Sequence, residues 1–244
     1  MKYMGSKNRI AKHILPIMLK HRTLEMTWVE PFVGGANMID KVDGKRIGND
    51  YNKYIYALLV ALRDGWQPPA EVSEEYYKEI KANRAEYDKC LVGYVGSQLT
   101  FGATWFGTYR RDKVGKRNYS DEAKRNVLKQ APRLKDVDFY NLNYQDLEIP
   151  PNSLIYCDPP YEGTFGYEKG KTFDHNIFWQ WCRDKAKEGH TVFVSEYNAP
   201  DDFKCIWEKQ LTQVINNTTN KTPKPVEKLF TLNGFEKTKE RGLF

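Results

Sequence analysis

The spacing of apolar residues changes several times along the first quarter of the chain. Apolar residues recur at helical spacing over residues 7–21, and a short apolar run over residues 27–32 indicates a strand. A glycine-bearing turn at 33–37, VGGAN, leads through a short helix to a second strand over residues 45–50 and a helix over 52–62. This order of elements is typical of a parallel sheet with crossover helices.

The alternation breaks off over residues 64–135, which are polar, rich in helical patterns, and finally basic and punctuated by glycine. It then resumes with a helix over residues 177–189 and five strands, which are predicted over residues 136–142, 153–158, 190–196, 204–208 and 227–232. Pro223 and Pro225 mark a loop before the last strand, which we expect at an edge of the sheet.

The simplest architecture for this pattern is a doubly wound α/β fold with a mostly parallel sheet. Residues 1–63 and 136–244 form its main domain. Residues 64–135 form an inserted module of helices or a hairpin. No internal repeat and no low-complexity tract contradicts this division.

The composition indicates a folded protein, because 40% of the 244 residues are hydrophobic and 14% are aromatic. No apolar run approaches the roughly 20 residues that span a bilayer, and no signal peptide is recognisable. The four cysteines form no close pair and the four histidines are scattered, so neither a zinc site nor a disulfide framework is expected. We expect a reduced, cytoplasmic protein without a metal, a membrane partner or an obligate protein partner.

Positive charge is concentrated in one part of the chain. Residues 110–135 carry ten basic side chains against three acidic ones, a surplus that exceeds the net charge of +6 of the whole chain. Such a concentration favours a polyanionic partner. The aromatic residues Trp105 and Tyr109 stand beside it, so a hairpin with a packed aromatic face and a solvated basic rim is the alternative interpretation.

In an open α/β sheet, ligands bind beyond the carboxyl ends of the strands, where four informative segments of this chain lie. Gly34 and Gly35 permit a tight turn after the first strand. Asp50 closes the second strand, where a carboxylate can accept both ribose hydroxyls of a nucleoside cofactor; capping of the next helix is a serious alternative. Asp146 follows the third strand and Asp158 the fourth. No GxxxxGK[ST] motif is present, so the nucleoside need not carry phosphates.

The fourth strand runs into an unusual turn in the stretch SLIYCDPPYEGT. Pro159 and Pro160 forbid both a helix and further ladder pairing, so the backbone after Asp158 is stiff. Asp-Pro commonly makes a plain turn, but a plain turn has no use for two prolines followed by Tyr161. We interpret the segment as one that aims a carboxylate, a carbonyl and a ring at one point.

Three motifs together resemble the D12 class of DNA adenine-N6 methyltransferases, the Dam type: KYMGSK at residues 2–7, EPFVGG at 30–35 and DPPY at 158–161. The resemblance covers essentially the whole chain in the same order. It implies a methyltransferase-type sheet, with residues 64–135 as the target-recognition module, and S-adenosylmethionine as methyl donor. It also implies a set of donor-binding residues, namely Tyr3, Lys7, Phe32, Gly34, Gly35, Asp50, Asp146 and Asp158.

The resemblance implies individual roles for some of these residues. Lys7 is expected near the carboxylate of the donor, Asp50 at its ribose and Asp146 near its adenine, while Asp158 borders both the donor and the target base. One departure is visible, because Ala36 replaces the last glycine of the family pattern FxGxG. Alanine is expected to be tolerated where only close packing is needed.

The chemistry of an amine acceptor supports a catalytic role for the DPPY turn. The amino nitrogen of adenine is a poor nucleophile because its lone pair is delocalised into the ring. The Asp158 carboxylate and the Pro159 carbonyl can accept its two hydrogens and turn the lone pair toward an electrophilic methyl group. Pro160 contributes rigidity, and Tyr161 offers a face for base stacking, worth about 1–3 kcal/mol. Such a pocket requires the base to leave the duplex.

The basic segment lies where the resembling family keeps its target-recognition module, and double-stranded DNA is the expected partner. Flipping a base requires phosphate clamps and a wedge. The candidate DNA-binding residues are Trp105, Tyr109, Arg110, Arg111, Lys113, Lys116 and Arg117.

Three alternatives stay open from the sequence alone. The substrate could be adenine in RNA or the N4 amine of cytosine, although the cytosine enzymes usually carry serine in place of Asp158. The protein could also be a nucleic-acid-binding relative that has lost catalysis, against which the intact DPPY, Lys7 and Asp50 argue. The recognition sequence and any pairing with a nuclease are not indicated.

Overall fold

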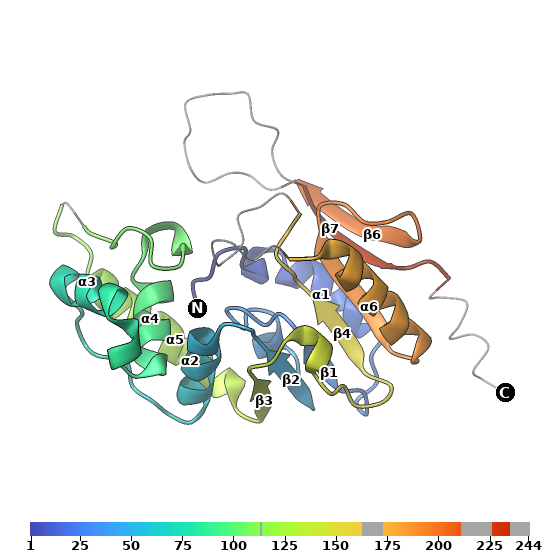
Figure 1. Ribbon diagram of the computed structural model, residues 1–244, viewed down its shortest axis with the longest axis horizontal. Helices are drawn as coiled ribbons and strands as arrows, with labels where there is room; N and C mark the ends of the chain where they lie inside the picture. Colours follow the sequence, from blue (N-terminus) through green and yellow to red (C-terminus); the bar gives the residue numbers. More distant parts are fainter. Residues whose placement is uncertain (113, 163–172, 211–225, 235–244) are drawn as a thin grey trace.

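The computed structural model describes residues 1–112, 114–162, 173–210 and 226–234. One seven-stranded sheet forms its centre, with strand order β3-β2-β1-β4-β5-β7-β6 (Figure 1). The strands are β1 (Trp28–Glu30), β2 (Arg46–Asn49), β3 (Val137–Tyr140), β4 (Leu154–Cys157), β5 (Thr191–Glu196), β6 (Phe203–Gln210) and β7 (Val226–Leu232). The predicted mostly parallel α/β fold is confirmed, and every predicted strand is present.

Five strands, β1 to β5, run parallel. From β1 the chain adds β2 and β3 on one side, and it then returns to add β4 and β5 on the other side of β1. Val29 of β1 is paired with Ile47 of β2 on one side and with Ile155 of β4 on the other. The order then continues outward to β3 on one side and to β5 on the other. This reversal is the topological switch point, beyond which open α/β sheets bind ligands.

The far side of the sheet differs from the sequence prediction. The last strand, β7, was expected at an edge, but it lies between β5 and β6 and is antiparallel to both. Burial explains the order, because β7 contributes the buried Glu227, Leu229 and Phe230, whereas β6 exposes most of its residues and forms the edge. The predicted loop at Pro223 and Pro225 lies outside the described residues.

Helices cover both faces of the sheet. The α-helices are α1 (Ala11–Leu19), α2 (Lys53–Arg63), α3 (Glu74–Ala82), α4 (Lys89–Gln98), α5 (Tyr119–Gln130) and α6 (His175–Lys187). Short 3₁₀ helices are η1 (Lys7–Arg9), η2 (Ile39–Lys41), η3 (Arg84–Glu86), η4 (Phe101–Ala103), η5 (Ala131–Leu134) and η6 (Tyr144–Asp146). In the part of the chain that the structure describes, no helix is both long and apolar enough to cross a membrane.

The two-residue period of the strands separates two apolar cores. Trp28 and Tyr156 point into the core that contains residues of α1 and α2. Their strand neighbours Val29 and Ile155 point into the other core, which contains Phe178 of α6. Successive side chains of a strand face opposite sides of the sheet, so each strand stabilises both layers and the sheet is covered on both faces.

The stretch between α2 and β3 packs against α2 through helix α4. Gly93 of α4 lies against the backbone of α2, since a Cβ atom at this position would stand only 2.1 Å from the carbonyl oxygen of Tyr54. Val92 and Val95 of α4 belong to the same buried cluster as Leu58 of α2. Figure 1 shows α3, α4 and α5 grouped beside α2, on the side away from β6.

Local side chains fix where the helices begin. The Asn52 side chain accepts hydrogen bonds from the backbone N–H groups of Tyr54 and Ile55, so Asn52 is the cap of α2. Asp174 caps α6 in the same manner, so this helix begins at His175, two residues before its predicted start. Capping by Asn52 leaves Asp50 available for another role.

The segment between α4 and α5 is not a regular hairpin in its described residues. A single bridge joins Thr100 to Tyr109, and the loop between them forms η4. Gly102 has a φ of +68° and Ala103 a φ of +59°, so the chain turns here and the two strands of a hairpin do not extend past the single bridge. In their described part, residues 64–135 are therefore predominantly helical.

Candidate active site

The carboxyl ends of β1, β2 and β4 bring three of the predicted segments to one edge of the sheet. The Gly34–Gly35 turn follows β1, Asp50 follows β2, and Asp158 follows β4. Because β1 lies between β2 and β4, this edge is the switch point of the fold. The fold alone therefore selects this edge as the ligand site.

Asp158 lies in a cluster of charged side chains that come from distant parts of the sequence. The Lys7 ammonium is 3.0 Å from Asp158 Oδ1 and 3.6 Å from Glu227 Oε2. It also donates a hydrogen bond of 2.9 Å to the carbonyl oxygen of Gly5. The side chain of Lys7 is only 4% exposed, so this ion pair is shielded from water and from salt.

Burial dominates the electrostatics of this cluster. Burial raises the pKa of Asp158 to about 6, although the Lys7 ammonium opposes the shift and the Glu227 carboxylate adds to it. Burial by itself would lower the pKa of Lys7, but Asp158 and Glu227 outweigh it and raise that pKa above its usual value. At neutral pH the site therefore holds an ionised Asp158 beside a charged Lys7.

Tyr161 is held on several sides. Its hydroxyl donates a hydrogen bond of 2.8 Å to Glu227 Oε2. The Lys7 ammonium lies 4.5 Å from the centre of its ring, and the Tyr197 ring meets it edge-on at 4.6 Å between centroids. The ring predicted to stack on a base is thus already part of a cation–π contact.

The turn between Asp158 and Tyr161 is supported from the neighbouring strand. Pro159 is buried and Pro160 is half-buried. The Glu196 carboxylate at the end of β5 accepts hydrogen bonds from the backbone N–H groups of Glu162, at 3.2 Å, and Tyr197, at 2.7 Å. Burial raises the pKa of Glu196 to about 7.

Asp50 connects the ends of β1 and β2. Its Oδ2 accepts a 2.9 Å hydrogen bond from the backbone N–H of Gly34, and its Oδ1 accepts a 2.8 Å bond from the N–H of Asn52. Burial raises its pKa to about 6 against these two bonds. A carboxylate has about four acceptor positions, so two remain for a ligand.

Tyr3 packs over the glycine turn. A Cβ atom at Gly34 would lie 2.6 Å from Tyr3 Cε1, and one at Gly35 would lie 2.7 Å from Tyr3 Cβ. Gly34 also has a φ of +48°. Ala36 adopts a φ of +52°, so close packing is not its only constraint, contrary to the expectation.

The predicted donor residues Phe32 and Asp146 are linked through an aromatic contact. The ring of Phe32 lies 5.1 Å from that of Tyr144, which belongs to the same short helix η6 as Asp146. Asp146 itself is exposed beyond the carboxyl end of β3. The backbone N–H of Leu142 bonds to the side chain of Asn49, which ties the end of β3 to that of β2.

The candidate DNA-binding residues divide into two groups. Arg110 forms an ion pair with Glu122 and lies over the Tyr119 ring, and Arg111 forms a forked ion pair with Glu74. Lys116 and Arg117 are exposed, and neither side chain forms an ion pair within the described part of the chain. Lys113 lies outside the described residues.

The two aromatic candidates of this segment have structural contacts. The Trp105 ring stacks on Tyr54 of α2 at 5.9 Å. The Tyr109 hydroxyl donates a 2.7 Å hydrogen bond to the carbonyl oxygen of Val72, and its ring packs against Tyr77. Trp105 therefore links this loop to α2, and Tyr109 links it to the segment before α3.

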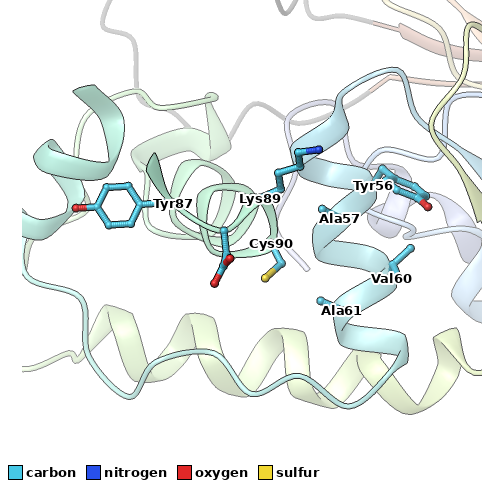
Figure 2. Close-up of a pocket in the computed structure, with 8 residues that line it drawn as sticks. Tyr56, Ala57, Val60, Ala61, Tyr87, Lys89 and Cys90 are labelled. Atoms are coloured by element: carbon cyan, nitrogen blue, oxygen red, sulfur yellow. The ribbon is translucent and has the colours of Figure 1, made fainter. Parts of the chain in front are cut away.

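A surface hollow of about 560 Å³ lies away from the charged cluster, between α2 and the start of α4 (Figure 2). Tyr56, Ala57, Val60 and Ala61 of α2 form one wall, and residues 87–90 form the other. None of the predicted site residues lines it. The switch point is the better candidate for catalysis because it gathers ionisable groups with shifted pKa values.

Two site residues were missed by sequence reasoning. Glu196 and Glu227 were predicted only as parts of strands, with no role in the site. The pattern offered a partial signal, because each is the single acid in a strand that also carries at least three apolar residues. An acid in a buried strand is rarely left unpaired.

The fold and the site define a doubly wound α/β protein with ionisable groups at its switch point, as in proteins that bind nucleoside cofactors. A family model for the D12 class N6 adenine-specific DNA methyltransferases matches residues 3–222, and the chain belongs to this family. No curated protein matches the chain. A similar solved structure is SMU.472, "a putative methyltransferase complexed with SAH", with 11% identity and a TM-score of 0.35. The match covers 93% of this chain and 52% of that structure, so this chain spans about half the length of that structure.

Proposed function

We propose that this protein transfers a methyl group from S-adenosylmethionine to the N6 amine of an adenine that is flipped out of duplex DNA. The observation that carries the proposal is the placement of Asp158 at the switch point, in a rigid DPPY turn, 3.0 Å from the buried Lys7 ammonium. Membership of the D12 class supports the same chemistry.

The residues present fit the donor. Asp50 has free acceptor positions for the ribose hydroxyls, while its existing bonds to Gly34 and Asn52 fix its orientation. Asp146 lies at the neighbouring strand end, where it would meet the adenine of the donor. Lys7 is the buried cation that can pair with the carboxylate of the donor. When bound, S-adenosylmethionine supplies an electrophilic methyl group on a sulfonium centre.

The chain prepares the acceptor amine. Asp158 and the carbonyl oxygen of Pro159 accept the two amine hydrogens, which frees the nitrogen lone pair. Pro160 keeps that carbonyl from moving. Tyr161 contacts the base with its ring, and its hydrogen bond to Glu227 fixes the ring in place.

DNA binding is assigned to the exposed face of the inserted helical stretch, residues 64–135. Lys116 and Arg117 are available for phosphate contacts, because intramolecular ion pairs do not hold them in the described part of the chain. Arg110 and Arg111 already neutralise Glu122 and Glu74, so they position this face and contribute less charge.

The proposal is tested by incubating the purified protein with labelled donor and a set of defined duplexes, and by mapping methylated bases through sequencing. Methyl groups on adenine N6 at one recurring sequence are the expected result. Matched single-stranded RNA and duplexes without adenine in the recurring site serve as controls. Methylation only of RNA or of cytosine would overturn the substrate assignment. Calorimetry that detects no donor binding would overturn the enzymatic assignment altogether.

A further inference from the structure

Glu227 is connected to the catalytic turn more closely than any other residue of β7. Its side chain is 10% exposed, and its Oε2 accepts the Tyr161 hydroxyl at 2.8 Å while lying 3.6 Å from the Lys7 ammonium. The matched family region ends at residue 222, so this carboxylate comes from a strand beyond it. It nevertheless contacts two residues of the family motifs.

We propose that Glu227 is a positioning residue for methyl transfer, which acts by holding the Tyr161 ring and the Lys7 ammonium and by giving the catalytic cluster a net negative charge. This inference rests on the proposed function. Glu227 need not touch the base or the donor to do so.

The positioning part of this role follows from the hydrogen bond. A phenol that donates to a carboxylate makes a charge-assisted bond, which is stronger than a bond between neutral groups. The bond joins β7 to the turn after β4 across 66 positions of sequence. It therefore fixes the ring of Tyr161 from outside its own loop, where Pro159 and Pro160 can set the backbone but not the ring orientation.

The electrostatic part follows from the charges around one ammonium group. Asp158 and Glu227 approach the same nitrogen of Lys7, at 3.0 and 3.6 Å, so the cluster contains two carboxylates and one cation. When an amine takes a methyl group from a sulfonium centre, the N–C bond would form as the S–C bond breaks, the sulfur would become a neutral thioether, and the nitrogen would become positively charged until it releases one proton to the carboxylate or to solvent. Fixed negative charge beside that nitrogen stabilises the transition state without reorganisation.

Other groups also face Asp158, and their charges enter any pH effect. The titratable groups around it come from η1, from β1, β4, β5 and β7, and from the turns after β4 and β5; they are Lys7, Glu30, Tyr156, Cys157, Tyr161, Glu196, Tyr197 and Glu227. Of these, Lys7 and the Tyr161 hydroxyl lower the pKa of Asp158, while Glu227 raises it. Substituting Glu227 and Tyr161 should therefore shift that pKa in opposite directions.

Two substitutions separate the two parts of the role. Glu227→Gln keeps an oxygen acceptor for Tyr161 and removes the charge, so the acid limb of the kcat profile should move about one pH unit lower, with roughly a tenfold loss of kcat. Tyr161→Phe removes the hydroxyl and keeps the ring. It should move the acid limb higher and raise the KM for DNA about tenfold. Glu208→Gln, an exposed position on β6 that faces Lys228, is the matched control and should change neither.

The readouts distinguish failure of this inference from failure of the proposed function. A wild-type protein that transfers no methyl group would refute the proposed function. The inference could still be tested in that case, because carbon NMR of the labelled Asp158 carboxyl would report whether the pKa of Asp158 falls in Glu227→Gln, as expected. An Asp158 titration unchanged in Glu227→Gln, or shifted equally in Glu208→Gln, would overturn the inference. Should Glu227→Gln fail to fold, an unchanged acid limb and KM in Tyr161→Phe would overturn it instead.

Discussion

Replacing Gly93 by alanine should destabilise the protein although it adds only one methyl group. The new Cβ would lie 2.1 Å from the Tyr54 carbonyl oxygen, 2.9 Å from the Tyr54 carbonyl carbon and 3.0 Å from Leu58 Cβ. Ordinary contact begins near 3.4 Å, so helix α4 must move about 1.3 Å away from α2. Two of the three opposing atoms belong to helix backbone and cannot turn aside.

The magnitude follows from two opposing effects. Overpacking of this kind costs about 1–3 kcal/mol, and more where the backbone has to shift. Alanine recovers up to about 1 kcal/mol through its higher helix propensity. Because α4 carries Val92 and Val95 into the core, its displacement also loosens apolar contacts. We expect a net loss of about 1–3 kcal/mol in the free energy of unfolding.

Urea denaturation followed by circular dichroism measures this loss. Asn126→Ala, at an exposed position inside α5, is the control for helix propensity and should change stability by less than about 1 kcal/mol. Gly93→Ala should also weaken DNA methylation, since α4 packs against α2, the helix that follows Asp50. A Gly93→Ala protein as stable as the wild type would refute the close packing of α4 on α2.

Three further predictions follow from the site. The transfer rate should fall about tenfold per pH unit below about 6, because Asp158, whose pKa is raised to about 6, loses its charge there; a rate that is flat down to pH 5 would exclude this role. Replacing Lys116 and Arg117 by alanine should lower the slope of log affinity against log salt by about 2, whereas Arg111→Ala, which breaks a pair with Glu74, should barely change it. Gly34→Ala should cost about 2–4 kcal/mol of unfolding free energy through its left-handed backbone and the Tyr3 ring. In a Tyr3→Ala background, Gly34→Ala should cost less, because the clash with the Tyr3 ring is gone. If the two substitutions lower the free energy of unfolding additively, the contact between Tyr3 and Gly34 is contradicted.

The elements that positioned the site could be predicted because their signals are local. Short runs of strand-forming residues marked β1, β2 and β4, and the two prolines after Asp158 could belong only to a turn. Because parallel strands place their carboxyl ends at one edge, Asp50 and Asp158 could be assigned to the same site without coordinates.

The remaining features depend on contacts between distant segments. Glu227 reaches Tyr161 only because β7 inserts between β5 and β6, an order that no local pattern encodes. The pairing of Arg111 with Glu74 likewise joins α3 to the loop before α5, which converts a candidate DNA contact into a structural one. Contacts between side chains that lie far apart in the sequence depend on how the elements pack, and the local sequence pattern does not predict them.

Single-turnover methylation by Asp158→Asn tests most directly whether the carboxylate of the DPPY turn prepares the amine. Asparagine keeps the size and one acceptor oxygen but removes the charge beside Lys7. We predict that, at saturating donor, the transfer rate is lower by about 10²–10³-fold, the usual effect of losing one preorganised partner in an active site. A transfer rate within threefold of the wild type, with the donor bound normally, would contradict the proposed chemistry.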